Sequence, residues 1–214
     1  GAGKTTLIML LLGILRPSNG KALVLGADAT YEFSRVGSAV GVVLDVHGLY
    51  EGLTAFQNLL FFGELFSLSR EAASQRASEL LRVAGLWNRR HDRVAAYSKG
   101  MKQRLAIARS LMHHPRLLIM DEPISGLDPE SRRATKDLIK RLAQDQSVTV
   151  LLSSHSLADI EELCSKVAIL SKGRLVAYDT VSSLRQSRDV SFIRITLARG
   201  QGRASVDGVL ASIE

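Results

Sequence analysis

The chain has 214 residues, of which 46% are apolar and 23% charged, a composition that suits one globular domain with a full core. No apolar run reaches the roughly 18 residues of a membrane-spanning helix, and the single Cys164 excludes an internal disulfide, so we expect a cytoplasmic protein. The net charge of +7 favours nucleotide phosphates, an anionic membrane surface or nucleic acid as partner, although a solvated basic surface is the simpler explanation.

The first residues, GAGKTT, have the pattern that ends a P-loop, G-x-x-x-x-G-K-[ST]. In such a loop, backbone N–H groups surround the phosphates, a lysine reaches the terminal phosphates and the next hydroxyl binds Mg²⁺. The first glycine of the motif would precede residue 1 and the chain has no initiator methionine, so we expect a fragment truncated at its N-terminus. The residues expected to contact nucleotide here are Gly1, Ala2, Gly3, Lys4, Thr5 and Thr6.

Two strands are predicted next, at residues 21–25 and 39–44, and the second leads to Asp45. Residues 53–66 then carry more Leu and Phe side chains than one core-facing stripe can hold. Some of these side chains should face a partner, although packing inside the domain is the simpler explanation for any one of them.

Residues 69–86 have the spacing of an amphipathic helix, and a basic connector follows at residues 88–93. The three arginines of the connector have neither interleaved aromatic residues nor a second basic stripe. We therefore expect a charged surface near lipid headgroups and no nucleic-acid site.

The next segment predicts a helix that starts after Ser98, followed by a buried strand with two carboxylates at its end. Ser98 is a good N-cap, and apolar residues follow it at helical spacing. The apolar run at 117–120 predicts a parallel strand, and Asp121 and Glu122 follow at its carboxyl end, where open α/β sheets bind ligands. Because neighbouring strand residues point to opposite sides, Asp121 can hold a magnesium ion and Glu122 a water molecule.

Two further polar side chains follow predicted helix and strand ends. Asp128 precedes Pro129 and is expected to cap a helix. The β-rich segment at 148–152 ends near His155. A strand-end imidazole can donate a hydrogen bond to a γ-phosphate and orient water near Glu122.

Together these motifs resemble those of ATP-binding-cassette (ABC) ATPases. SKGMKQRLAIARSL is similar to the family's signature segment, LSGGQ followed by QR and an alanine-rich helix, with Tyr97, Lys99 and Met101 in place of the common Leu, Gly and Gln. The form YSKGMKQR resembles that of ABC-2 type exporters. LLIMDEP resembles the Walker B strand with its glutamate, and SGLDP resembles the D-loop.

The resemblance implies the α/β fold of a P-loop NTPase of the ABC-ATPase type. In this fold a mainly parallel core sheet is flanked by helices, and an α-helical subdomain carries the signature. We expect the ATPase domain at residues 1–184, lacking its N-terminal strands, with the helical subdomain at about 53–115. Residues 185–214 would begin a C-terminal extension.

The resemblance also implies an activity: ATP binding and hydrolysis that drive transport, in the export direction, through a separate integral membrane permease. The subunit would lie at the cytoplasmic face of the membrane, with ATP and Mg²⁺ as cofactors. Asp121 and Thr5 would support the metal, Glu122 would polarise the attacking water, and His155 would hold the γ-phosphate.

A second ABC ATPase subunit, identical or different, is implied as a partner. Ser98 and Gly100 of one subunit would complete the nucleotide site of the other, and Asp128 would lie at their interface. Leu49, Tyr50, Phe56 and Phe62 correspond to the groove that receives a short cytoplasmic helix of the membrane subunit.

One departure from the family pattern concerns Asp45, which occupies the place of the Q-loop glutamine. An aspartate can still bind a hard cation, which makes Asp45 a third candidate metal ligand. It also adds negative charge beside Asp121 and Glu122, and an ordinary exposed loop aspartate explains it equally well.

Two other functional classes stay open at this point. A soluble ABC ATPase acting on nucleic acid or ribosomes would share every motif, but such proteins usually have a coiled-coil insertion or a second cassette, and neither occurs in this sequence. A non-enzymatic module with a degenerate site has Asp45 as its only support.

Overall fold

The computed structural model describes residues 2–145, 148–186 and 194–198. The helices are α1 (Lys4–Leu11), α2 (Phe33–Ala39), α3 (Ala55–Leu65), α4 (Arg70–Val83), η1 (Trp87–Arg89), η2 (Val94–Ala96), α5 (Lys99–Ser110), α6 (Pro129–Asp145), α7 (Leu157–Leu163) and α8 (Val181–Gln186). The strands are β1 (Leu23–Val24), β2 (Ala27–Asp28), β3 (Val40–Val43), β4 (Leu117–Met120), β5 (Thr149–Ser154), β6 (Lys166–Ser171), β7 (Arg174–Thr180) and β8 (Arg194–Ala198).

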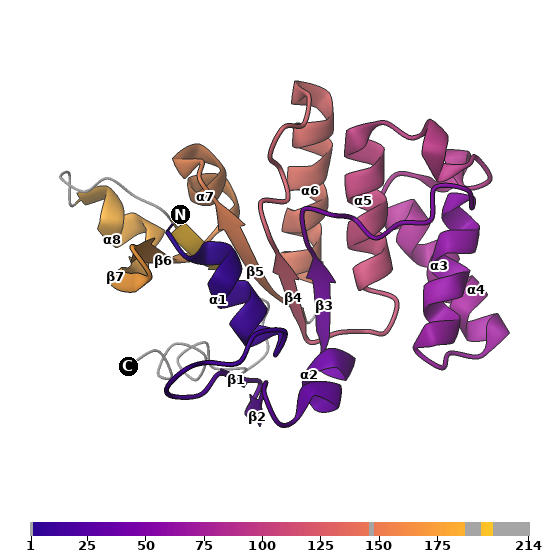
Figure 1. The fold of residues 1–214 in the computed structure, drawn as a ribbon. Helices are drawn as coiled ribbons and strands as arrows, with labels where there is room; N and C mark the ends of the chain where they lie inside the picture. Colours follow the sequence, from indigo (N-terminus) through magenta and orange to yellow (C-terminus); the bar gives the residue numbers. More distant parts are fainter. Residues whose placement is uncertain (1, 146–147, 187–193, 199–214) are drawn as a thin grey trace.

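The core sheet has the strand order β3-β4-β5-β8-β6-β7 and helices on both sides (Figure 1). β3, β4 and β5 pair in parallel. β8 is antiparallel to both β5 and β6, so β6 runs in the same direction as the parallel strands, and β7 forms the antiparallel edge. The predicted α/β class with a mainly parallel sheet is therefore confirmed.

One described strand of the expected C-terminal extension lies inside this sheet. β8 begins within residues 185–214 and fills the position between β5 and β6. Residues 187–193 and 199–214 lie outside the described residues, so the predicted boundary at residue 184 stays a prediction.

Helices α3, α4 and α5 form a group beside the edge strand β3 (Figure 1). α5 joins this group to the sheet, because four consecutive residues near its centre are buried and no face of that turn is left to solvent. These residues are Leu105, Ala106, Ile107 and Ala108. The predicted N-cap of this helix is confirmed, since the Ser98 hydroxyl accepts a hydrogen bond from the Met101 amide at 3.2 Å.

The first helix is short. α1 ends at Leu11, Gly13 after it has a left-handed φ of 68°, and Leu15 is exposed. Ile8, Leu11 and Leu12 pack into the core. Within the described ranges, no helix combines the length and the apolar character needed to cross a bilayer.

A buried amide fastens the segment between β3 and α3. Asn58, on α3, is fully buried, and its Nδ2 donates to the carbonyl oxygens of Tyr50 (2.9 Å) and Thr54 (3.0 Å). Its Oδ1 accepts from the Tyr50 amide at 2.9 Å. Asn58 thus replaces the backbone partners that Tyr50 would have in regular secondary structure.

We predict that Asn58→Ala lowers the free energy of unfolding by about 1–3 kcal/mol, because it leaves the Tyr50 amide and carbonyl without these partners. Urea unfolding of the full-length protein measures this loss. Glu64→Ala is the matched control, since Glu64 is exposed on the same helix and should change stability by less than about 0.5 kcal/mol. Equal losses in the two variants would contradict the assigned role of Asn58.

Candidate functional site

The glycine-rich segment at the start of the chain forms a tight loop that opens α1. Gly3 has a φ of 96°, a conformation that side chains with a Cβ disfavour, and it is the N-cap of α1. The Ala2 carbonyl accepts a hydrogen bond from the Gly173 amide at 3.1 Å, so the turn between β6 and β7 supports the loop. Thr6 is exposed on α1, and Gly1 lies outside the described residues.

The Asp121 carboxylate joins α1 to the end of β5. Its Oδ2 accepts a hydrogen bond from the Thr5 hydroxyl at 2.8 Å. Its Oδ1 accepts one from the Ser153 hydroxyl at the end of β5. Asp121 itself follows β4 and is buried. Three segments that are far apart in the sequence therefore meet at one carboxylate.

The neighbouring Glu122 carboxylate lies between two basic side chains. The Lys4 ammonium is 3.3 Å from Oε1, and Nδ1 of His155 is 2.8 Å from Oε2. Glu122 has a φ of 49°, a left-handed conformation that is uncommon outside glycine and that clusters at functional sites. The structure thus brings together Lys4, Glu122 and His155 beside the Thr5–Asp121 pair.

Ser153 also belongs to this site, and no motif in the sequence points to it. It is fully buried, and its hydroxyl both donates to Asp121 and accepts from the Glu122 amide at 3.0 Å. It fixes the carboxylate of one residue and the backbone of the next. The available signal was a hydroxyl at the end of an apolar strand, where a buried polar group needs a partner.

Ser98, Gly100 and Asp128 lie at the starts of α5 and α6. A Cβ added to Gly100 would lie 2.2 Å from Cβ and Oγ of Ser131, so glycine permits the close packing of these two helices. Asp128 caps α6, accepting from the Ser131 amide at 2.9 Å, and the hydrogen bonds from Ser131 lower the pKa of Asp128. Within the described part of the chain, none of the three hydrogen-bonds or ion-pairs with Lys4, Thr5, Asp121, Glu122 or His155.

Asp45 is exposed two residues beyond β3. Among the described residues, it forms no hydrogen bond or ion pair with Thr5 or Asp121. Burial lowers the pKa of the nearby His47, and the charge of Asp45 acts in the opposite direction. The structure therefore does not bring Asp45 into contact with the other two predicted metal ligands, and its metal role stays a prediction.

An apolar groove of about 350 Å³ lies between α1, α2, β3, α3 and α5. Ile14 and Phe33 on its wall are each 56% exposed, and Arg109 and His113 add polar groups. The residues lining it are Leu12, Ile14, Phe33, Val36, Gly37, Val40, Val42, Phe62, Phe66, Arg109, Ser110 and His113.

Of the four side chains expected to face a partner, Phe62 lines this groove. Leu49, Phe56 and Phe62 itself are partly buried and pack against the core. Tyr50 is half exposed and makes an edge contact with Phe61, with ring centroids 4.8 Å apart.

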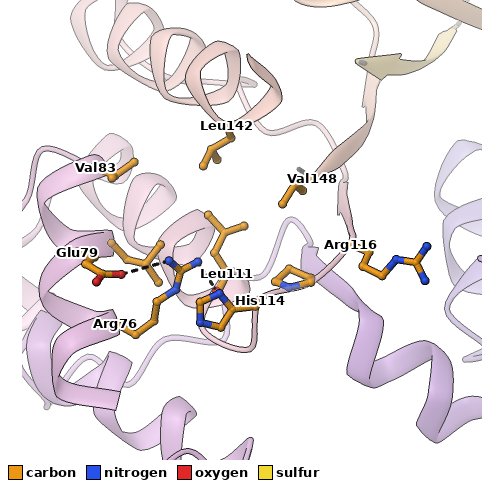
Figure 2. Close-up of a pocket in the computed structure, with 10 residues that line it drawn as sticks. Arg76, Glu79, Val83, Leu111, His114, Arg116, Leu142 and Val148 are labelled. Carbon is orange, nitrogen blue, oxygen red and sulfur yellow. Dashed lines mark hydrogen bonds and ion pairs between the residues drawn. The ribbon is translucent and has the colours of Figure 1, made fainter. Parts of the chain in front are cut away.

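A second cavity, of about 550 Å³, lies at the amino ends of β4 and β5, next to the residues that precede these strands (Figure 2). Arg76 pairs there with Glu79 (3.4 Å) and donates to the Leu111 carbonyl (3.1 Å), while Arg116 points away from them (Figure 2). This cavity is separate from the Lys4–Glu122–His155 group, which lies at the carboxyl ends of the strands.

Comparison with known proteins gives the family of the chain. Residues 1–125 match the model of the ABC transporter family. The ABC transporter ATP-binding protein YhcH of Bacillus subtilis (strain 168) is 36% identical over 181 residues, which are 85% of this chain and 58% of YhcH. The daunorubicin/doxorubicin resistance ATP-binding protein DrrA of Streptomyces peucetius is 37% identical over 212 residues, 99% of this chain and 64% of DrrA.

The chain therefore spans about three fifths of the length of these relatives. Among solved structures, cbiO1 from Clostridium perfringens, part of the ABC transporter complex cbiONQ, has the same fold, with a TM-score of 0.79 and 23% identity. That match covers 87% of this chain and 76% of cbiO1. On the match to the family model and the identity with these relatives, the chain belongs to the ABC transporter family.

Proposed function

We propose that the protein is the ATP-binding and ATP-hydrolysing subunit of an ABC transporter and drives export through a separate membrane permease. The main support is the convergence of Lys4, Glu122 and His155 beside the Thr5–Asp121 pair. Phosphoryl transfer depends on this kind of positioning and charge stabilisation. Relatives named as transporter or resistance ATP-binding proteins favour transport over a role on nucleic acid.

The Thr5–Asp121 pair suits a magnesium ion. Mg²⁺ prefers oxygen ligands, is usually held by one or two carboxylates, and keeps waters and substrate phosphates as its other ligands. A hydroxyl and a carboxylate oxygen 2.8 Å apart supply such donors from two different segments. When bound, the ion would neutralise charge on the phosphate oxygens.

The contacts of Glu122 suggest how nucleotide changes the site. Lys4 and His155 both attract the Glu122 carboxylate in this structure. A triphosphate carries more negative charge than one carboxylate and competes for the same two side chains. As Lys4 and His155 turn to phosphate oxygens, Glu122 becomes free to polarise a water molecule.

Ser98, Gly100 and Asp128 are proposed to face the nucleotide of a second ATPase subunit. Ser98 is exposed at the N-terminus of α5, and such helix ends attract phosphate through free N–H groups. The support is the exposed placement of Ser98 and Asp128 at helix starts, and the absence of any contact between the three residues and this chain's own Lys4–Glu122 group within the described ranges. ATP shared by two subunits would then control whether they stay closed.

The groove between α1 and α3 is the proposed docking surface for the permease. It combines exposed apolar side chains with a buried floor, which is typical of surfaces that bind a partner. One of its walls is the end of α1, whose other end carries Lys4 and Thr5. This surface would hold the subunit at the cytoplasmic face of the membrane.

We predict that Glu122→Gln keeps ATP affinity but lowers kcat for ATP hydrolysis by about 10² or more, the scale contributed by a positioned general base. Phosphate release by the full-length protein measures kcat, and a nucleotide titration measures binding. Glu71→Gln, at an exposed position on α4, is the control and should leave kcat unchanged. Turnover near that of the wild type in Glu122→Gln would refute the role assigned to Glu122.

Lys4→Ala is expected to act on binding itself, because it removes a charged contact to the terminal phosphates. We expect the Kd for ATP with Mg²⁺ to rise by about tenfold or more, which corresponds to one lost charge-assisted hydrogen bond. Calorimetric titration with a non-hydrolysable ATP analogue provides the measurement. Lys21→Ala, at an exposed position, should bind like the wild type. An unchanged Kd in Lys4→Ala would contradict the P-loop interpretation.

A charge placed in the groove should separate docking from catalysis. Ile14→Glu is expected to reduce, by about tenfold or more, the amount of protein bound to membrane vesicles that contain the proposed permease. ATP hydrolysis by the isolated subunit should not change. Val176→Glu, exposed on β7 away from the groove, serves as the control. Equal vesicle binding by both variants and the wild type would exclude this groove as the docking surface.

A further inference from the structure

Two helices, α6 and α7, begin close to residues assigned to the candidate site. α6 begins directly after Asp128, and α7 begins directly after Ser156, the residue that follows His155. The His155 side chain is 66% exposed, and within the described residues its ring has one hydrogen-bond partner, Glu122. The direction of the imidazole therefore depends on how firmly the backbone at the start of α7 is held.

An ionic cluster around the buried Asp159 carboxylate holds that backbone to α6. Asp159, in the first turn of α7, is only 3% exposed. Its Oδ2 is 2.5 Å from Nη2 of Arg132, and its Oδ1 is 2.7 Å from the Lys136 ammonium. The same Arg132 Nη2 lies 3.4 Å from the Ser156 hydroxyl, which also accepts from the Asp159 amide at 3.4 Å.

The charge of Asp159 favours one arrangement of α7 against α6. Burial alone would raise the pKa of Asp159, but hydrogen bonds from Lys136, Arg132 and Ser156 outweigh burial and lower the pKa. The carboxylate is therefore charged, and a buried charge is costly unless its partners stay in place. Nη2 of Arg132 donates to both Asp159 and Ser156, so one side chain of α6 contacts two residues at the start of α7.

A second set of ion pairs joins α6 and α7 and can be compared with the Asp159 cluster. Glu162, one turn further from His155, is 2.6 Å from the Lys136 ammonium and 2.8 Å from the Lys140 ammonium. Its side chain is 42% exposed, so solvent weakens both pairs. Near His155 the acidic partner, Asp159, is buried and shares Arg132 with Ser156, whereas the acidic partner further away, Glu162, is exposed.

We propose that Asp159, held by Arg132, is a positioning residue for His155, and that it links the start of α6 at Asp128 to the imidazole. The proposal rests on the proposed ATPase function and adds to it a residue that does not touch the nucleotide. Because Arg132 lies one turn after Asp128, with its amide bonded to the Asp128 carbonyl at 2.8 Å, a shift at Asp128 reaches His155 through a short, rigid path.

The test compares Asp159→Ala, Asp159→Glu and Glu162→Ala in the full-length protein. Asp159→Ala should lower kcat for ATP hydrolysis about tenfold, because small misplacements of a positioned group are costly, and leave KM and the ATP affinity within about twofold. Asp159→Glu keeps the charge and should restore most of the activity. Glu162→Ala should match the wild type. Loss of kcat in Glu162→Ala equal to that in Asp159→Ala would overturn the proposal.

A double mutant separates positioning of His155 from a general loss of structure. In a His155→Ala background, Asp159→Ala should cause no further loss of kcat, because the group that it positions is absent. Additive losses would overturn the proposal. Should Asp159→Ala fail to fold, Arg132→Lys keeps the positive charge but lacks the planar guanidinium whose Nη2 contacts both Asp159 and Ser156, and it should show the same decrease in kcat with KM unchanged.

The two proposals fail in different ways. A wild-type protein that binds ATP but does not hydrolyse it would overturn the proposed function, and this inference with it. An active wild type whose kcat is unchanged in both Asp159→Ala and Arg132→Lys would overturn the positioning role alone.

Discussion

The site depends on the Asp121 carboxylate, which holds three separate segments together. One oxygen accepts from Thr5 at the start of α1, and the other accepts from Ser153 at the end of β5. Because Asp121 is buried, losing either partner would leave a carboxylate oxygen without a hydrogen bond, which is costly in the interior. The position of Glu122 follows from this arrangement, since Ser153 also binds the Glu122 amide.

Charge balance gives this site two distinct states in the proposed function. Without nucleotide, Glu122 satisfies Lys4 and His155, so the basic groups that would bind phosphate are already gathered. The phosphates of ATP would displace the carboxylate and release it toward water. In the proposed positioning role, the contact of Arg132 with the buried Asp159 links the start of α6 to His155.

Local sequence patterns predicted several helix and strand ends that position the site. The cap at Ser98, the strand at 117–120 and the helix start after Asp128 each follow from neighbouring residues, and the structure confirms them. The P-loop lysine and the strand-end carboxylates were chosen from residue type and spacing alone. Such features are local, because capping, strand length and side-chain alternation act over a few residues.

What the sequence determined by itself was the order of elements and the residue types at their ends. Only the tertiary structure decided which ends meet: that Ser153 bridges Asp121 and Glu122, that Gly100 packs on Ser131, that Asp45 stays apart, and that β8 lies between β5 and β6. These contacts join residues far apart in the chain. They depend on strand order and helix packing, which no short stretch of sequence specifies.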